Sequence, residues 1–147
     1  MRRILFPARA QSQSRYFVDH YATWRDKRIQ CITDHYGKGF FQDKKILEVG
    51  CGYGDIGARF AQLGADVTCS DARKEHLKML KMKYPFLKTV QADLDTEWPF
   101  EEKFDVILYL GTLYHLTHFE KPLLQACAAA KHLILEAEVC DSDDPDM

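Results

Sequence analysis

The chain has 147 residues, a formal net charge of −2 and an isoelectric point near 6.3. This length suits one domain with a substantial core, and contents of 46% hydrophobic and 29% charged residues are ordinary for a globular protein. A charge so close to neutral gives no general attraction to nucleic acid. No stretch approaches the roughly 18 apolar residues that a membrane-spanning helix needs. We therefore expect neither a membrane protein nor a nucleic-acid-binding one.

The five cysteines stand singly along the chain, and none forms a C-x-x-C pair. This pattern argues against a disulfide framework or a structural zinc site, and the histidines show no metal-ligand spacing, so we expect no metal. The opening segment has only the short apolar run Ile4–Phe6 before Pro7, which is too short for the core of a signal peptide. A reducing cytoplasm is the location that these features predict.

Hydrophobic periodicity predicts a first helix from Ser14 to about His35, after which strands and helices alternate. The third predicted helix offers Leu77, Met79 and Leu80 for burial. The predicted strands cover residues 45–49, 66–70, 87–91, 104–110 and 132–139, and the predicted helices between them cover 55–63, 73–83 and 121–130. Alternation with short connections predicts an α/β fold, namely a three-layer αβα, doubly wound and mostly parallel sheet of about five strands.

The most informative segment is the run Gly50-Cys51-Gly52-Tyr53-Gly54, which joins the first strand directly to a helix. In a doubly wound sheet this turn lies at the edge where ligands bind. Glycines tolerate positive φ angles and let a ligand approach the backbone, and the N–H groups at the start of the helix carry partial positive charge. A nucleotide-like ligand is therefore indicated; the alternative is a plain tight turn.

Two classes of nucleotide compete for this loop. Gly52–Gly57 matches G-x-G-x-x-G, and Asp71 follows about 20 residues later, as in proteins that bind NAD(P). However, the glycine directly after the strand is Gly50, and counting from it places Asp55 where the third glycine belongs. A carboxylate there would repel a pyrophosphate, so an NAD(P)-dependent oxidoreductase is the less favoured interpretation.

The segment Ile46–Gly54 resembles the first motif, E/D-x-G-x-G-x-G, of class I S-adenosylmethionine-dependent methyltransferases. The resemblance implies a Rossmann-like methyltransferase core with S-adenosylmethionine as cofactor. Its methionine end would lie on the loop backbone above Glu48, and Asp71 would bind both ribose hydroxyls, as well as cap the next helix. The cofactor contacts implied by the resemblance are Glu48, Gly50, Cys51, Gly52, Gly54, Asp71, Ala72, Ala92, Asp93, Leu94, Leu110 and Gly111, together with Tyr21 and Arg25 from the N-terminal helix.

Two further segments extend the resemblance. Asp93 follows the third strand, where the family places a carboxylate on the adenine amino group; a turn or capping role for Asp93 and Asp95 is the alternative. The segment Phe104–Leu116 resembles the fourth strand and the loop after it, which makes Tyr114 and His115 the candidate catalytic residues. His115 would act as a base because histidine titrates near neutral pH. The alternatives are a loop histidine bonded to backbone and a core tyrosine.

These observations predict that residues 1–40 form an N-terminal arm and helix, packed on the sheet or capping the site, and that residues 41–147 form the S-adenosylmethionine-binding domain. The predicted function is in-line methyl transfer to a small-molecule acceptor, because the loop after the fourth strand lacks the N/D-P-P-Y/F pattern of base methylation. A catalytically inactive binding module, or a subunit that needs a partner, is the alternative. The family's last two strands are not found in the sequence, so we expect a homo-oligomer or a partner chain to cover the sheet edge.

Overall fold

The computed structural model describes residues 8–138, with side chains from residue 22 onward. The chain divides into two compact units, Met1–Lys38 and Gly39–Met147. In the first unit, helix α1 (Ala8–Tyr36) contains the helix predicted for residues 14–35 and begins earlier. It ends at Gly37, which has a φ of 81° and whose N–H donates to the carbonyl of Thr33 at 2.8 Å, a typical helix C-cap.

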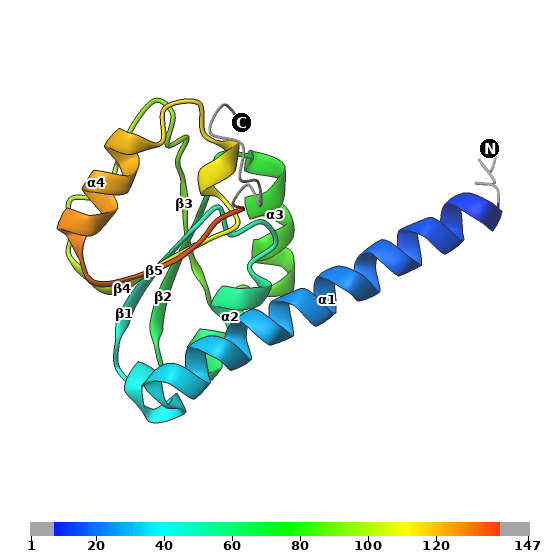
Figure 1. Cartoon of the computed structure of the whole chain (residues 1–147), viewed down its shortest axis with the longest axis horizontal. Coiled ribbons are helices and arrows are strands. Elements are labelled where there is room, and N and C mark those ends of the chain that lie inside the picture. The colour runs from blue at the N-terminus through cyan, green and yellow to red at the C-terminus, as the bar shows by residue number, and fades with distance from the viewer. Residues whose placement is uncertain (1–7, 139–147) are drawn as a thin grey trace, which may run out of the picture. The chain divides into compact units, whose positions relative to one another are not determined.

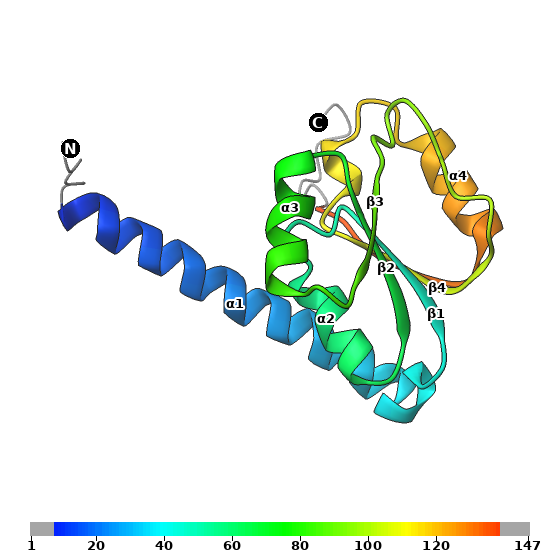
Figure 2. The same ribbon diagram turned by 180° about the vertical axis from the view of Figure 1, so that it is seen from behind.

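The second unit is a five-stranded parallel sheet in the order β3-β2-β1-β4-β5. Helices α2 and α3 cover one face and α4 covers the other (Figures 1 and 2). The strands are β1 (Lys45–Val49), β2 (Asp66–Asp71), β3 (Lys88–Gln91), β4 (Phe104–Leu110) and β5 (Ala130–Glu136), and the helices are η1 (Lys38–Phe41), α2 (Asp55–Gln62), α3 (Lys74–Lys83), η2 (Leu113–His115) and α4 (Glu120–Ala129). The predicted doubly wound α/β fold is confirmed.

The central strands β1 and β4 are apolar because both of their faces are covered. Leu47 and Val49 pack with Ile107 and Tyr109 in a cluster that includes Ala126 of α4. This cluster also contains Ala92, Leu94 and Phe100, so the segment between β3 and β4 helps to cover the α4 face. Because all five strands are parallel, their carboxyl ends meet at one edge of the sheet, next to this packed core.

One predicted core residue is misplaced. Leu77 and Leu80 of α3 are buried, whereas Met79 is 53% exposed. Successive residues in a helix are turned by about 100°, so Met79 lies nearly opposite the face that Leu77 and Leu80 share. The prediction of burial for Met79 was wrong.

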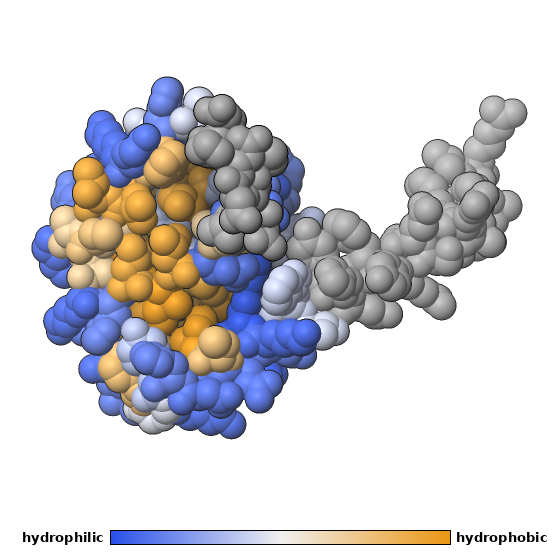
Figure 3. Space-filling model, viewed as in Figure 1, coloured by the Kyte–Doolittle hydropathy of each residue, from blue (hydrophilic) through white to orange (hydrophobic). Residues whose placement is uncertain are grey.

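Strand β5 forms the edge of the sheet beside β4. Figure 3 shows apolar side chains gathered over the part of this unit where β5 and α4 lie, and Leu135 of β5 is 44% exposed. Within residues 8–138, no helix is both long enough and apolar enough to cross a bilayer.

Candidate functional site

The glycine loop between β1 and α2 has a left-handed backbone at each of its three glycines. Gly50, Gly52 and Gly54 have φ angles of 66°, 55° and 77°. A Cβ at Gly50 would lie 2.1 Å from Thr112 Oγ1, and one at Gly54 would lie 2.6 Å from Leu80 Cδ1. By contrast, no atom lies within 4 Å of the Cβ position of Gly52. The loop is therefore packed at both ends and open in the middle, where a ligand can approach the backbone.

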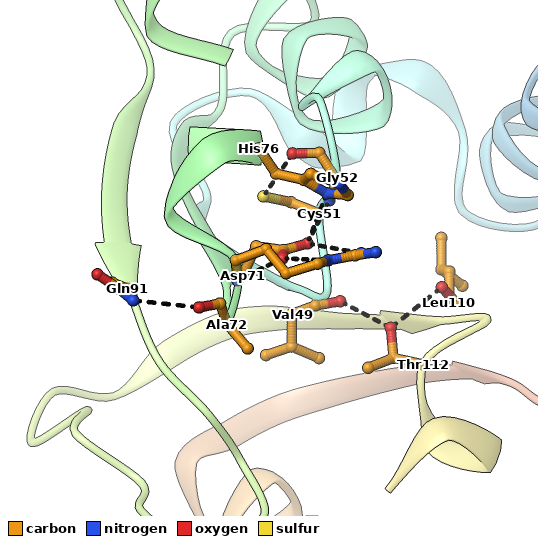
Figure 4. Close-up of polar contacts among 10 residues, drawn as sticks. Val49, Cys51, Gly52, Asp71, Ala72, His76, Gln91, Leu110 and Thr112 are labelled. Carbon is orange, nitrogen blue, oxygen red and sulfur yellow. Dashed lines mark hydrogen bonds and ion pairs between the residues drawn. The ribbon is translucent and has the colours of Figure 1, made fainter. Parts of the chain in front are cut away.

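Asp71 ends β2 and faces this loop, as Figure 4 shows. Its Oδ2 accepts the Gly52 N–H at 2.9 Å, and its Oδ1 accepts the Arg73 N–H at 2.9 Å and the Arg73 Nε at 3.1 Å. Burial alone would raise the pKa of the Asp71 carboxyl, but the hydrogen bonds from Arg73 and Gly52 outweigh it and hold the pKa below its usual value. The side chain is thus an ionised acceptor, and it also organises the turn into α3.

A pocket of about 400 Å³ opens beside Asp71 at the carboxyl edge of the sheet. Its lining residues come from the glycine loop, the ends of β2 and β3 and the loop after β4, which is where ligands bind in open α/β sheets. They are Gly50, Asp71, Ala72, Arg73, Ala92, Asp93, Leu94, Asp95, Gly111, Thr112, His115 and Leu116.

Seven of the predicted cofactor contacts and His115 thus line one pocket. Four lining residues were not predicted: Arg73, Asp95, Thr112 and Leu116. A signal existed for each, because Arg73 and Asp95 follow predicted carboxylates by two residues, and Thr112 and Leu116 flank His115 in the loop after β4.

Glu48 lies on the opposite face of β1, beneath the start of α2, and does not line the pocket. Its Oε2 accepts the Gly57 N–H at 2.9 Å and the Cys69 thiol at 3.5 Å. Burial raises the pKa of the Glu48 carboxyl to about 8, although the hydrogen bonds from Cys69 and Gly57 oppose the change. Glu48 therefore supports the glycine loop from below, as a largely protonated side chain near neutral pH.

The remaining loop residues act mainly through their backbone. The Cys51 N–H donates to the carbonyl of Ser70 at 2.9 Å, and the Gly54 N–H donates to the carbonyl of Cys51 at 2.9 Å. The Cys51 thiol is buried. The first bond holds the loop on β2, and the second closes a turn within the loop.

Asp55, in the first turn of α2, does not present its carboxylate to the pocket. Its Oδ1 accepts the Tyr84 hydroxyl at 2.7 Å and pairs with the Lys83 ammonium of α3. Asp55 is therefore compensated by Lys83 and does not line the pocket. The expected repulsion of a pyrophosphate by Asp55 is not supported, whereas the register that makes Gly50 the first glycine after β1 holds.

The loop after β4 brings His115 to the pocket. Thr112 Oγ1 donates to the carbonyl of Val49 at 3.2 Å, and the His115 N–H donates to the carbonyl of Thr112 at 3.0 Å within η2. The Tyr114 and His115 ring centroids are 4.4 Å apart, but Tyr114 is 44% exposed and does not line the pocket. The alternative of a core tyrosine is therefore wrong.

Asp93 combines a lining position with a turn role. Its Oδ1 accepts the Asp95 N–H at 3.1 Å, and its carbonyl accepts the Thr96 N–H at 3.0 Å. The turn role considered for Asp93 is therefore present, and the adenine contact stays a prediction.

The contacts predicted for Tyr21 and Arg25 also stay predictions. The Tyr21 side chain lies outside the described ones, and Arg25 belongs to α1 in the other unit. Among the described residues, no group of three or more His, Cys, Asp or Glu could hold a metal ion.

Comparison with known families agrees with this site. Residues 46–133 match the family model described as "Methyltransferase domain". The chain is 33% identical over 109 residues to the ubiquinone biosynthesis O-methyltransferase of Photobacterium profundum. The matched stretch covers 69% of this chain and 44% of that protein. The enzyme of the same name from Bordetella avium is 30% identical over 101 residues, covering 62% and 39%. The chain therefore spans less than half the length of these relatives.

Solved structures give the same answer for the fold. A TehB-like S-adenosylmethionine-dependent methyltransferase from Corynebacterium glutamicum is 27% identical with a TM-score of 0.54, over 76% of this chain and 65% of that one. DesVI of Streptomyces venezuelae has a TM-score of 0.72 at 13% identity, over 95% and 61%. Magnesium protoporphyrin IX methyltransferase from Synechocystis, solved with bound SAH, has a TM-score of 0.66 at 22% identity, over 80% and 55%. Since the family model spans more than half of its residues, the chain belongs to the class I S-adenosylmethionine-dependent methyltransferases.

Proposed function

We propose that this chain binds S-adenosylmethionine beside Asp71 and promotes transfer of the methyl group to a hydroxyl oxygen of a small molecule. The observation that carries the proposal is the single pocket shared by the glycine loop, Asp71, Asp93 and His115. These groups come from four different strand ends, and a pocket that joins a cofactor-binding edge to a titratable side chain suits a reaction centre.

The polar and apolar groups that line the pocket suit S-adenosylmethionine. The ionised Asp71 carboxylate can accept both hydroxyls of a ribose, provided that the Arg73 side chain moves aside. Ala72, Ala92 and Leu94 supply apolar lining for an adenine ring, and Asp93 supplies an acceptor for its amino group. The open backbone at Gly52 leaves room for the methionine end.

The bound cofactor supplies an electrophilic methyl group on a sulfonium, which departs as a neutral thioether and needs no acid. The protein must align the acceptor and, for a hydroxyl, remove its proton. His115 lines the pocket, and a neutral imidazole nitrogen can accept such a proton. Tyr114, whose ring lies against His115, would border the acceptor.

One observation favours an oxygen acceptor, and a second disfavours the exocyclic amines of nucleic-acid bases. Both curated relatives are named O-methyltransferases. In addition, the loop reads Leu110-Gly111-Thr112-Leu113 rather than the N/D-P-P-Y/F pattern. We therefore propose a small, hydroxyl-bearing acceptor.

The test has two steps. Calorimetric titration with S-adenosylhomocysteine should give saturable binding, and labelled S-adenosylmethionine should then transfer its methyl group to members of a panel of phenols, alcohols, amines and thiols. Label on a phenol or alcohol supports the proposal. Binding without transfer to any acceptor would favour an inactive binding module, and binding of NAD alone would overturn the assignment.

Two proposals concern the surroundings of the chain. The exposed edge of β5 and the apolar surface over β5 and α4 suit coverage by another chain, either a second copy or a different protein. Light scattering that gives only the 17.1 kDa of one chain at micromolar concentration would contradict a second copy. The buried free thiols of Cys51 and Cys69 suit a reducing compartment, and we propose the cytoplasm.

A further inference from the structure

Asp95, in the segment between β3 and β4, makes a long-range contact that the sequence does not reveal. Its Oδ1 accepts the backbone N–H of Thr117 at 2.8 Å and that of His118 at 3.0 Å, across 22 and 23 residues of chain. Hydrogen bonds from N–H groups to an ionised carboxylate are stronger than those to a neutral acceptor. One side chain therefore holds two successive backbone groups between η2 and α4.

These two N–H groups stand at the far end of the loop that carries His115. At the near end, Thr112 Oγ1 donates to the carbonyl of Val49. Between these points, the N–H groups of His115 and Leu116 bond only within the turn, to the carbonyls of Thr112 and Leu113. His115 thus lies on a short span of chain fixed at one end by Thr112 and at the other by Asp95.

Asp95 is also connected to the cofactor side of the pocket. Its N–H donates to Asp93 Oδ1 at 3.1 Å, and both carboxylates line the pocket together with His115. Burial raises the pKa of Tyr109 to about 12, and the charge of Asp95 adds to this effect. The Asp95 side chain therefore sits between the predicted adenine contact and the loop after β4.

We propose that Asp95 is a positioning residue that holds the span from Thr112 to His118 so that His115 faces the pocket. The inference rests on the proposed function, because it assigns His115 the role of base. Removal of the Asp95 carboxylate leaves two N–H groups without their acceptor and releases one end of the span. Asparagine in its place keeps an Oδ1 acceptor at the same position.

The experiment compares Asp95→Ala and Asp95→Asn with Glu97→Ala, a matched control in the same segment whose side chain is exposed. In Asp95→Ala, we expect the amides of residues 115–118 to exchange hydrogen at least tenfold faster. We also expect kcat to fall about tenfold or more while the affinity for S-adenosylhomocysteine changes less than threefold. Asp95→Asn should recover most of both properties, and Glu97→Ala should match the unmodified chain.

Unchanged exchange of residues 115–118 in Asp95→Ala would overturn the proposal, and so would full kcat in that variant. Exchange as fast and a kcat as low in Asp95→Asn as in Asp95→Ala would also overturn it, because the acceptor atom would then not be the cause. Failure of the proposed function has a different signature: the unmodified chain would show no transfer to any acceptor. The exchange comparison would still decide whether Asp95 holds the loop.

Discussion

Two loops meet at the pocket, and they are built in different ways. The loop from Gly50 to Gly54 is shaped by its own left-handed glycines and by backbone bonds to β2. The loop from Gly111 to His118 also begins with a left-handed glycine and with a backbone bond, from the Gly111 N–H to the carbonyl of Glu136. Beyond that point it is held by two side chains, Thr112 at one end and Asp95 at the other. The first loop therefore depends mainly on its own backbone conformation and on the neighbouring strand β2, whereas the far end of the second depends on one side chain, Asp95. The proposed cofactor binding and the proposed chemistry therefore depend on loops that are held in different ways.

The largest expected effect tests the support beneath the first loop. Glu48 has a pKa of about 8 in the folded chain and near 4.5 when unfolded, so the unfolded state loses its proton first. The Glu48 contribution to the free energy of unfolding should be constant below about pH 4.5. It should then fall by several kcal/mol as the pH rises through 8. Denaturant unfolding at pH 5, 7 and 9 should show this slope in the unmodified chain, and a much smaller one in Glu48→Gln. The same pH dependence in both proteins would show that the Glu48 carboxyl does not cause this loss of stability.

The next effect compares two glycines of the same loop. Gly50→Ala combines a positive φ with a contact 2.1 Å from Thr112 Oγ1, and it should lower the free energy of unfolding by about 3 kcal/mol. Gly52→Ala has a similar φ but open space, so about 1 kcal/mol is expected. Urea unfolding of both variants measures the difference. Equal losses would mean that the packing of Gly50 on Thr112 is unimportant.

The second loop is tested by its titratable residue. His115→Gln should lower kcat about a hundredfold, the usual contribution of a general base, and leave the affinity for S-adenosylhomocysteine within about twofold. Steady-state kinetics and calorimetry on the same preparation separate the two properties. A variant that binds ten times more weakly but turns over normally would assign His115 to binding.

The smallest effect concerns the bridge between the loops. Thr112→Val keeps the shape of the side chain but removes the hydroxyl that donates to the carbonyl of Val49, at a cost of about 1 kcal/mol in stability. Thr112→Ser, which keeps the hydroxyl, is the matched control. The two melting temperatures report the difference, and no difference would show that this hydroxyl contributes nothing.

The sequence predicted the first loop far better than the second. Periodicity and alternation located all five strands, and β1 and β4 have the predicted bounds because both are buried on two faces. The strand predicted for residues 132–139 is instead β5, Ala130–Glu136, so its bounds were wrong by two to three residues. Asp71 could be placed from its spacing to the glycines. By contrast, the contact of Asp95 with Thr117 and His118 has no local pattern, since it depends on how two distant loops pack. Asp55 shows the same limit, because its partners Lys83 and Tyr84 lie on another helix.

The most direct test of the central claim is calorimetric titration of S-adenosylhomocysteine into the unmodified chain and into Asp71→Ala, with NAD as the alternative ligand. Asp71 is the buried carboxylate that joins the glycine loop to the pocket. Its loss should weaken S-adenosylhomocysteine binding by about 1–3 kcal/mol, roughly tenfold or more, while NAD binds neither protein. Equal affinities of the two proteins, or binding of NAD in place of S-adenosylhomocysteine, would contradict the assignment of this pocket.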